Sequence, residues 1–349
     1  MRREMFSSEG NWYKGNLHSH TTNSDGRLKP EEAVKLYKSY GYHFMCFSEH
    51  DVFTDLRKEF DSENFILLPG VEASAWLLHI DGEDRKKCGN LTDLSLSELA
   101  AYASRAKNSY LIKTHHIHGI LGNADMQQEA GDSVFKNGEQ LHPPIYFEEW
   151  NGLEAAQKLS DYLRSKGCFT TYNHPVWSRV ETSEVVGLKD VWAMEICNYG
   201  TVVECGEGQD SVFWDATLRK GIPMKGFASD DNHNPGKFFD SLGGWVCVRS
   251  KELTHEAIVN HLLAGDYYFS AGPEICQWGI EDNKVFVECS DVERINFIVG
   301  GPVGSSETIL KHESRLSGGY HELKGNETYV RVECIDKKGR TAWTNALFL

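Results

Sequence analysis

Hydrophobic residues in the first three-quarters of the chain follow two alternating patterns: short continuous runs, and longer segments with a helical period. The helical period is clear in one early set, which comprises Ala33, Leu36, Tyr37 and Tyr40. Pro30 suits the first turn of this helix, and Gly41 suits its end. The continuous run at 43–48 then predicts a buried strand that follows the helix directly.

The same alternation recurs along the chain and predicts about seven strand–helix units. Further strands are expected at 65–68, 110–112, 168–172, 191–194 and 224–228, and further helices at 153–165, 211–220 and 255–263. The expected fold class is therefore α/β, with the strands closed into a TIM-like barrel. Two polar segments interrupt the pattern: 78–106, a candidate excursion over the barrel mouth, and 123–144, a helix-poor candidate lid.

The helical period stops after Ala271-Gly272-Pro273. Beyond it, alternating runs at 284–289, 294–299 and 328–332 are separated by turn residues. This pattern predicts a small all-β, sandwich-like region. We therefore expect a barrel domain at residues 1–273 and a C-terminal β domain at residues 274–349.

Histidines and acidic residues follow most of the predicted barrel strands. The candidates are His18, His20, Asp25, His50, Glu72, His116, His174, Asp231 and His233. Residues at the carboxyl ends of barrel strands converge on one mouth, so these side chains are expected to meet. Imidazole and carboxylate are ligands that divalent transition metals accept. A metal ion that keeps an open coordination position takes about three protein ligands, so the set suits two or three ions.

The residues alone do not decide which histidine completes this set. The run Thr114–His118 offers His115, His116 and His118, of which His116 and His118 share one strand face. His79 is a rival, because it follows soon after Glu72. A buried glutamate is costly unless it is paired or metal-bound, so Glu72 itself is either a ligand or a member of a core ion pair.

Several other polar residues near these strand ends allow two interpretations. Asp230 competes with Asp231 as a ligand, whereas Glu49 and Asp51 either orient ligands or belong to a solvated loop. Glu195 and Asn198 end a predicted strand and are expected to line the mouth without binding metal.

Charge and composition restrict the partners. The chain has 36 basic and 51 acidic residues, a formal charge of −15, which argues against general affinity for a nucleic-acid backbone. We see no hydrophobic stretch near the length of a membrane span and no signal-peptide pattern, so a cytoplasmic location is expected. The nine cysteines include no C-x-x-C motif and are interpreted as reduced core residues.

Taken in order, the motifs resemble those of the PHP (polymerase and histidinol phosphatase) superfamily over roughly residues 13–272. The matching residues are His18-x-His20, Ser24-Asp25-Gly26, His50-Asp51, Pro69-Gly70-Val71-Glu72, His174-Pro175 and Asp231-x-His233. The resemblance implies a distorted (βα)7 barrel with a two- or three-metal site that takes Zn, Mn or Fe. It implies a first metal on His18, His20, Glu72 and Asp231, a second on Glu72, His174 and His116 (or His118 or His79), and a third on Asp25, His50 and His233.

The resemblance also implies a metal-dependent hydrolase, foremost a phosphoesterase acting on a small phosphorylated molecule. A metal-bound hydroxide would attack, and no protein side chain is needed as the nucleophile. Arg179 is expected to hold a substrate phosphate. Two alternatives remain: a hydrolase of a carboxyl ester or carbamate, and a non-catalytic, metal-stabilised binding protein that uses Trp278 and Trp343 on its β domain.

Overall fold

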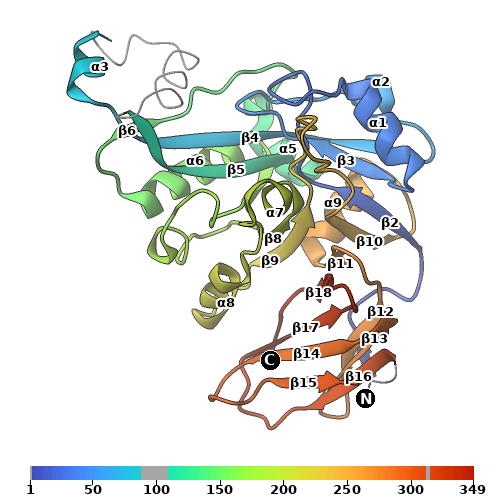
Figure 1. Cartoon of the computed structure of the whole chain (residues 1–349). Coiled ribbons are helices and arrows are strands. Elements are labelled where there is room, and N and C mark those ends of the chain that lie inside the picture. Colours follow the sequence, from blue (N-terminus) through green and yellow to red (C-terminus); the bar gives the residue numbers. More distant parts are fainter. Residues whose placement is uncertain (1, 88–108, 312–314) are drawn as a thin grey trace.

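The computed structural model describes residues 2–87, 109–311 and 315–349 (Figure 1). These ranges form a mixed α/β structure with one large sheet and one four-stranded sheet. The main path of the large sheet contains, in spatial order, β15 (Glu307–Leu310), β14 (Arg294–Gly300), β17 (Tyr329–Ile335), β18 (Thr341–Thr344), β11 (Tyr267–Ser270), β10 (Trp245–Ser250), β2 (Asn11–Asn16), β3 (Phe44–Phe47), β4 (Ile66–His79), β5 (Tyr110–Leu121), β7 (Cys168–Tyr172), β8 (Ala193–Asn198) and β9 (Lys225–Ser229). Two short strands pair beside this path, β6 (Ile145–Phe147) with β4 and β19 (Leu347–Phe348) with β17.

Two groups of parallel strands carry the predicted strand-end residues. Strands β2, β3 and β4 are parallel, as are β7, β8 and β9. An isolated parallel bridge joins Ser19, just after β2, to Asn232, just after β9. The carboxyl ends of the first and last parallel strands are therefore neighbours, which brings their following residues together.

Strand β5 departs from the predicted alternation. It runs antiparallel to both β4 and β7, and it pairs with β4 over almost its whole length. The prediction that 110–112 leads to histidines at a strand exit was therefore wrong, because His116 and His118 lie in the middle of β5. The residues of a strand fit either direction of pairing, so the sequence pattern does not reveal that β5 is antiparallel.

Helices lie between the strands much as the periodicity predicts. The α-helices are α1 (Pro30–Ser39), α2 (Arg57–Phe60), α3 (Gly82–Lys87), α5 (Ala124–Ala130), α6 (Gly152–Ser165), α7 (Tyr199–Cys205), α8 (Ser211–Arg219) and α9 (His255–Ala264), with short 3-10 turns η2 (Gly131–Ser133) and η3 (Thr182–Glu184). In α1 the buried face consists of Ala33, Val34 and Tyr37. Tyr40 is exposed, contrary to prediction, because α1 ends at Ser39 and the chain turns away.

The two interrupting segments have different outcomes. Residues 88–108 of the predicted excursion lie outside the described part of the chain. Segment 123–144 is not helix-poor, since it contains α5 and η2. Asn123 begins α5, because its side chain accepts a hydrogen bond from the Met126 N–H group.

The region after Pro273 contains only strands among its described elements. The four-stranded sheet has the order β1 (Arg2–Glu4), β12 (Ile275–Glu281), β13 (Lys284–Val292) and β16 (Leu316–Glu322). The other C-terminal strands join the large sheet, where β18 pairs with β11. Trp278 and Trp343 are buried, so neither offers the exposed ring that a binding surface would need. The division at residue 273 stays a prediction.

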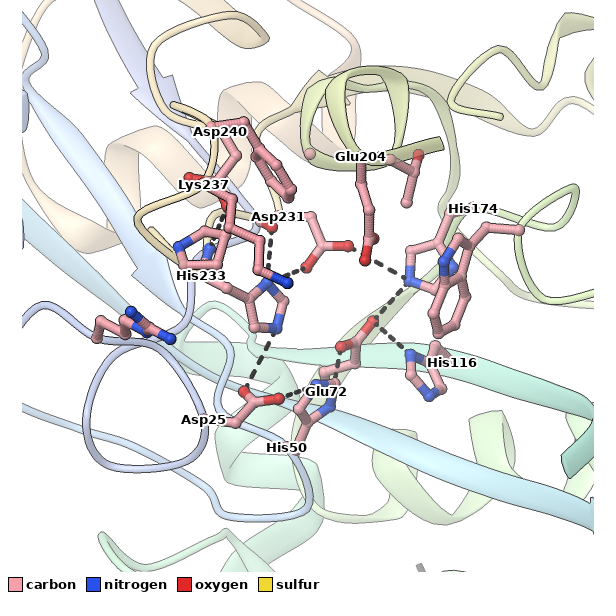
Figure 2. A pocket seen from close by; sticks show the side chains of 16 residues that line it. Asp25, His50, Glu72, His116, His174, Glu204, Asp231, His233, Lys237 and Asp240 are labelled. Atoms are coloured by element: carbon pink, nitrogen blue, oxygen red, sulfur yellow. Dashed lines mark hydrogen bonds and ion pairs between the residues drawn. The ribbon is translucent and has the colours of Figure 1, made fainter. Parts of the chain in front are cut away.

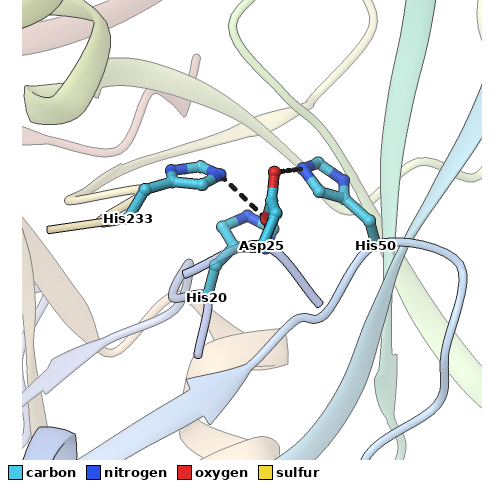
Figure 3. A group of neighbouring side chains, drawn as sticks. All are labelled: His20, Asp25, His50 and His233. Carbon is cyan, nitrogen blue, oxygen red and sulfur yellow. Dashed lines mark ion pairs between the residues drawn. The ribbon is translucent and has the colours of Figure 1, made fainter. Parts of the chain in front are cut away.

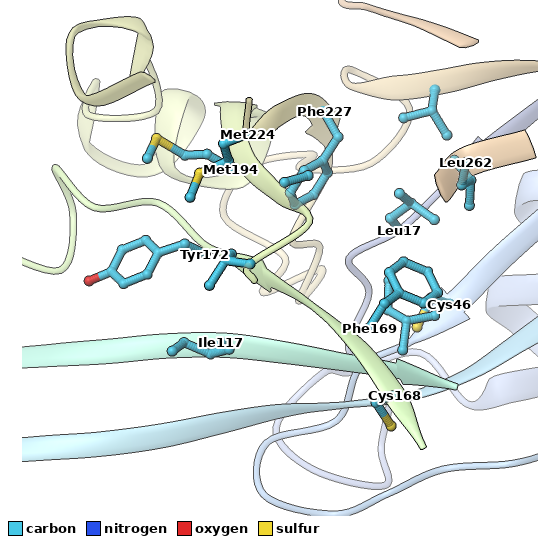
Figure 4. Packing of buried hydrophobic residues seen from close by; sticks show 14 of the residues in the cluster. Leu17, Cys46, Ile117, Cys168, Phe169, Tyr172, Met194, Met224, Phe227 and Leu262 are labelled. Atoms are coloured by element: carbon cyan, nitrogen blue, oxygen red, sulfur yellow. The ribbon is translucent and has the colours of Figure 1, made fainter. Parts of the chain in front are cut away.

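The main hydrophobic core fills the space between the strands that carry the candidate ligands (Figure 4). It includes Leu17, Cys46, Ile117, Phe169 and Phe227, all nearly inaccessible to solvent. The eight described cysteines are free thiols, and most are buried, as the sequence predicts. None of the helices in the described residues is long and hydrophobic enough to cross a membrane.

Candidate metal centre

The predicted ligands meet at the carboxyl ends of the parallel strands and on the inner face of the antiparallel pair β4–β5. Asn16 shapes the exit of β2, since its side chain contacts the backbone of His18 and accepts from the Asp230 N–H group. Ser48 accepts from the Ser19 N–H group and so joins the end of β3 to the His18–His20 segment. The loops that carry the histidines are therefore fixed to neighbouring strands.

One group of four buried side chains comprises His18, His20, Glu72 and Asp231. Nε2 of His18 lies 3.2 Å from Glu72 Oε1 and 3.0 Å from Asp231 Oδ1. Nε2 of His20 lies 3.4 Å from Glu72 Oε2 and 3.1 Å from Asp231 Oδ1. Two imidazoles and two carboxylates thus direct nitrogen and oxygen atoms at one point, as a transition-metal site requires.

A second group contains His20, Asp25, His50 and His233 (Figure 3). Asp25 lies between two imidazoles: Oδ1 is 3.3 Å from His233 Nε2, and Oδ2 is 3.6 Å from His50 Nε2. His233 is oriented by its other nitrogen, which lies 3.0 Å from the Asp231 carbonyl oxygen. This group is more open to solvent than the first.

Glu72 is the centre of the arrangement. Its carboxylate lies 3.2 Å from His50 Nδ1, 3.3 Å from His116 Nδ1 and 3.2 Å from His174 Nε2. Asn173 donates to Glu72 Oε1 at 2.9 Å. The interpretation of Glu72 as a member of an Arg or Lys core pair finds no support among the described residues, because its ion-pair partners there are histidines.

The structure separates the rival histidines. His79 lies near the far end of β4, where it pairs with Glu148 at 2.9 Å. His115 faces the other side of β5, with Nδ1 2.5 Å from the Tyr172 hydroxyl. His116 faces the cavity beside Glu72, whereas His118 lies deeper, 3.9 Å from Glu72 Oε1 and edge-on to His18. His116 therefore has the best position of the four.

Two candidate ligands have positive backbone φ angles: His174 at 26° and Asp231 at 51°. Such angles are strained for residues other than glycine and gather at functional sites. The sequence predicts an extended exit at His174 before Pro175, so its angle was not foreseen. The Glu195 side chain compensates by accepting from the His174 N–H group. A Cβ at Gly200 would lie 2.7 Å from the Asp231 carbonyl oxygen, so glycine is required there.

Glu195 contacts the candidate ligands directly, whereas the sequence predicts only that it lines the barrel mouth without binding metal. Glu195 is fully buried, and its Oε1 lies 3.0 Å from His18 Nδ1. It also accepts from Ser229 Oγ, from Asn198 Nδ2 and from the His174 backbone. A glutamate within a buried hydrophobic run was the available signal, the same one that identified Glu72. Both residues lie inside their strands, β8 and β4, and not at the strand exits that the sequence predicts.

The acids that competed with the candidate ligands have structural partners. Asp230 accepts hydrogen bonds from the Tyr37 hydroxyl and from the N–H groups of Leu242, Gly243 and Gly244, so it fixes the loop after β9. Glu49 accepts from Thr21 and from Ser24 Oγ, and so holds the loop that carries Asp25. Asp231, in contrast, faces the histidines.

Burial and charge set the protonation of the cluster. Burial disfavours charged His18 and His20, but Asp231 and Glu72 outweigh it and raise the pKa of both, that of His20 to about 10. Burial and the charge of His20 lower the pKa of His50 to about 3. Burial opposes ionisation of Glu72, yet the surrounding histidines hold its pKa well below the usual range. The buried carboxylates therefore require positive charge, which protons or metal ions can supply.

A cavity of about 470 Å³ opens above this cluster (Figure 2). Its lining includes Arg27, Lys237 and Trp177 in addition to the candidate ligands. Neither Arg27 nor Lys237 forms an ion pair with another described side chain. Arg179 does not line this cavity; it is exposed and pairs with Glu207 at 2.9 Å. The structure thus brings seven of the nine predicted ligands to the cavity wall and places Arg179 outside.

The other two, His18 and His20, are fully buried and lie against Glu72 and Asp231. Several atoms in this cluster have no hydrogen-bond partner within the described residues, although they are buried: His20 Nδ1, Glu72 Oε2, His116 Nδ1, Asp231 Oδ1 and both nitrogens of His118. Unsatisfied buried polar atoms are costly and call for a partner such as an ion. The donor set therefore fits divalent metal ions.

No family model matches the chain, and no curated protein matches it. Among solved structures, a two-domain protein from Bacteroides vulgatus that contains a predicted PHP-like metal-dependent phosphoesterase matches over 99% of both chains, with 12% identity and a TM-score of 0.43. A candidate metal-dependent phosphoesterase from Bifidobacterium adolescentis matches 64% of this chain and 89% of its own, with 11% identity and a TM-score of 0.35.

An amidohydrolase from Chromobacterium violaceum, solved with bound sulfate and without metal, matches 65% of this chain and 89% of its own, with 14% identity and a TM-score of 0.38. At such low identity and TM-score, an activity must be deduced from the residues of the site.

Proposed function

We propose that the protein is a metal-dependent hydrolase of the PHP type, foremost a phosphoesterase that acts on a small phosphorylated molecule. The observation that carries this proposal is the position of Glu72. One buried carboxylate lies within 3.4 Å of His18, His20, His50, His116 and His174, which come from different strands or their following loops. Bridging carboxylates of this kind hold adjacent metal ions in hydrolases.

Two or three divalent ions, Zn, Mn or Fe, fit the donor groups. The first would be held by His18, His20, Glu72 and Asp231, the second by Glu72, His116 and His174, and the third by Asp25, His50 and His233. When bound, such ions supply an activated water and neutralise charge on the phosphoryl oxygens. We also propose that β2–β9 form the distorted (βα)7 barrel of this family, followed by a C-terminal β domain, in a cytoplasmic protein.

The side chains around the cavity have separate tasks. Arg27 and Lys237 are placed to bind phosphoryl oxygens by charge-assisted hydrogen bonds. Glu195 holds the His18 ring through Nδ1, which leaves Nε2 directed at the centre of the site. The one hydroxyl side chain in the described lining, Thr201, donates to the Asn198 carbonyl oxygen within the first turn of α7. No protein nucleophile is therefore proposed.

The test combines metal analysis with a substrate panel. Purified protein loaded with Mn, Zn or Fe is expected to hydrolyse phosphomonoesters or phosphodiesters and to lose this activity on chelation. Glu72→Gln should lose at least one bound ion per chain and nearly all turnover, whereas His79→Ala should retain both. A fully metal-loaded protein that cleaves no phosphate ester in the panel would disprove the proposal.

A second candidate, hydrolysis of a carboxyl ester or carbamate, is favoured by the charge of the cavity. Its lining contains five carboxylates, at Asp25, Glu72, Glu204, Asp231 and Asp240, but only two side chains that always carry positive charge. Fewer cations suit a substrate with less negative charge. Aryl carboxyl esters and carbamates in the same panel distinguish the two functions by their relative kcat/KM.

A further inference from the structure

A second cavity, of about 620 Å³, adjoins the candidate metal centre. It shares four lining residues with the first cavity: Asp25, His50, His116 and Trp177. Its other lining residues include Ser74, Trp76, Leu111 and Leu141. A molecule held at the metal centre could therefore extend directly into this space.

The antiparallel pair β4–β5 supplies one wall of the second cavity. Successive residues on one face of a strand are two apart, so Glu72, Ser74 and Trp76 share a face of β4. On β5, His116 lies opposite Ser74 and shares that face. The same surface thus passes from the candidate metal ligands to an indole ring within four residues.

Trp177 forms the boundary between the two cavities. It follows His174 after β7, and its ring lies 5.0 Å from the His174 ring at an interplanar angle of 84°. Its ring also lies 5.7 Å from that of His116. An aromatic wall therefore stands directly against two candidate ligands of the second metal.

The chemistry of the two cavities is different. The first contains Arg27 and Lys237, whereas no lysine or arginine occurs in the described lining of the second. Trp76, Leu111 and Leu141 make much of its wall hydrophobic. Hydrophobic surface of this kind favours an uncharged group, and indole rings favour a flat aromatic one. The charged and uncharged parts of one substrate can thus be held at opposite ends of a continuous space.

We propose that this second cavity binds the leaving group of the substrate, and that this group is a flat, uncharged aromatic alcohol. The inference rests on the proposed phosphoesterase function. In the reaction, an oxygen of water bonds to phosphorus, the ester P–O bond breaks, and the aromatic oxygen takes up a proton. The products are inorganic phosphate and the free aromatic alcohol.

The first experiment compares 2-naphthyl phosphate with glycerol 2-phosphate. Trp76→Ala and Leu111→Ser should each lower the ratio of kcat/KM for the naphthyl ester to that for the glycerol ester by about tenfold, from the loss of hydrophobic contact. Leu111 is partly exposed, so its substitution tests the same wall without a large cavity in the core. Tyr320→Ala, an exposed aromatic residue on β16, is the matched control and should leave the ratio unchanged.

An unchanged ratio in both cavity variants, with both esters hydrolysed, would overturn the leaving-group site but not the phosphoesterase function. If neither ester is hydrolysed, binding of 2-naphthol, followed by quenching of tryptophan fluorescence, tests the site alone. Binding that Leu111→Ser weakens and Tyr320→Ala does not would support an aromatic-binding site even if the phosphoesterase function fails. Absence of naphthol binding to the unmodified protein would overturn the inference.

Discussion

Glu72 and Glu195 are two buried glutamates with opposite tasks. Glu72 presents its carboxylate to the centre of the site, where it faces five histidines. Glu195 is surrounded by hydrogen-bond donors, among them Ser229 Oγ and Asn198 Nδ2. We therefore expect Glu72 to bind a cation and Glu195 to orient its neighbours, although Glu195 also forms a candidate metal group with His18 and His174.

Replacing Glu195 by glutamine should weaken metal binding without removing a ligand. The amide nitrogen would face a donor at His18 Nδ1 or at the His174 N–H group, because both carboxylate oxygens now accept hydrogen bonds. Loss of such an orienting partner costs about 10- to 100-fold in metal affinity. Competition with a fluorescent chelator measures this change. Glu59→Gln, an exposed control, should bind metal normally; equal affinities in all three proteins would show that Glu195 has no orienting role.

Asp210 makes stability depend on pH. Burial and the charge of Glu195 raise its pKa from an ordinary value of 3.8 to about 8. A folded-state pKa above the unfolded value means that the carboxylate is disfavoured in the fold, so its contribution becomes destabilising as pH rises from about 4 to 8. Its Oδ1 accepts from the Val176 N–H group, a bond that asparagine can keep.

Asp210→Asn should therefore gain on the order of 2 kcal/mol in unfolding free energy relative to the unmodified protein at pH 8, and almost nothing at pH 4. Urea denaturation at several pH values measures the difference. Asp132→Asn, at an exposed site, is the matched control. A constant difference between the Asp210 variant and the unmodified protein at all pH values would contradict the prediction.

Individual residues were predictable where the type of side chain decides the chemistry. His18, His20, Asp231 and His233 follow from their spacing on extended segments, and the structure brings them together. The choice between His79 and His116 was not predictable, because it depends on how β4 and β5 pair. Arg179 failed to reach the cavity for a local reason: its φ of 61° turns the chain, and Glu207 binds its guanidinium group.

At the level of elements, the antiparallel pairing of β4 with β5 is the main departure from a regular strand–helix alternation. Helical period and turn residues predicted α1, α6, α8 and α9 within one or two residues, because these helices show a hydrophobic face in the sequence itself. The direction of β5 leaves no such trace, since both orientations bury the same residues. The consequence is that His116 reaches the site from the middle of a strand.

A buried ion cluster joins α8 to β17. Arg331 on β17 is only 1% exposed and forms bidentate contacts of 3.0 Å with Asp215 on α8, with Glu333 at 2.7 Å as a further partner. Removing one partner of a buried pair leaves the other charge uncompensated, which is more costly than replacing the pair by hydrophobic groups.

Asp215→Ala is therefore expected to lower the unfolding free energy by about 3 kcal/mol. The double variant Asp215→Ala/Arg331→Met should be less destabilised than the single variant, because no guanidinium remains buried with Glu333 as its one carboxylate partner. Chemical denaturation of both variants provides the comparison. If the double variant is the less stable of the two, the contact stabilises through packing of the arginine stem instead.

At the scale of the whole molecule, the metal centre is expected to link stability to pH. The raised pKa of His18 and His20 keeps protons on these rings when no metal is bound. Metal ligands must be deprotonated, so uptake of Zn or Mn should release protons and become weaker as pH falls. Because the ligands come from the ends of many strands, metal should also raise Tm, and a chelator should lower it.

Titration calorimetry in two buffers of different ionisation enthalpy measures the protons released for each ion bound. Release of at least one proton per ion at pH 7 is expected for a site with charged histidines. Glu72→Gln is the control, since it should bind at least one ion fewer and therefore give less binding heat and a smaller shift in Tm. Metal uptake without proton release would show that these histidines are neutral before binding.

The pairing of β1 with β12 has a consequence for synthesis of the chain. Arg2–Glu4 bond to Gly279–Glu281, so β1 finds its partner only after the central region between them has been translated. Until then it is an unpaired edge, which is a template for wrong association. The adjacent β2 must meanwhile assemble with β3. The four-stranded sheet can therefore close only after β16 has been synthesised, whereas β2 and β3 can pair much earlier.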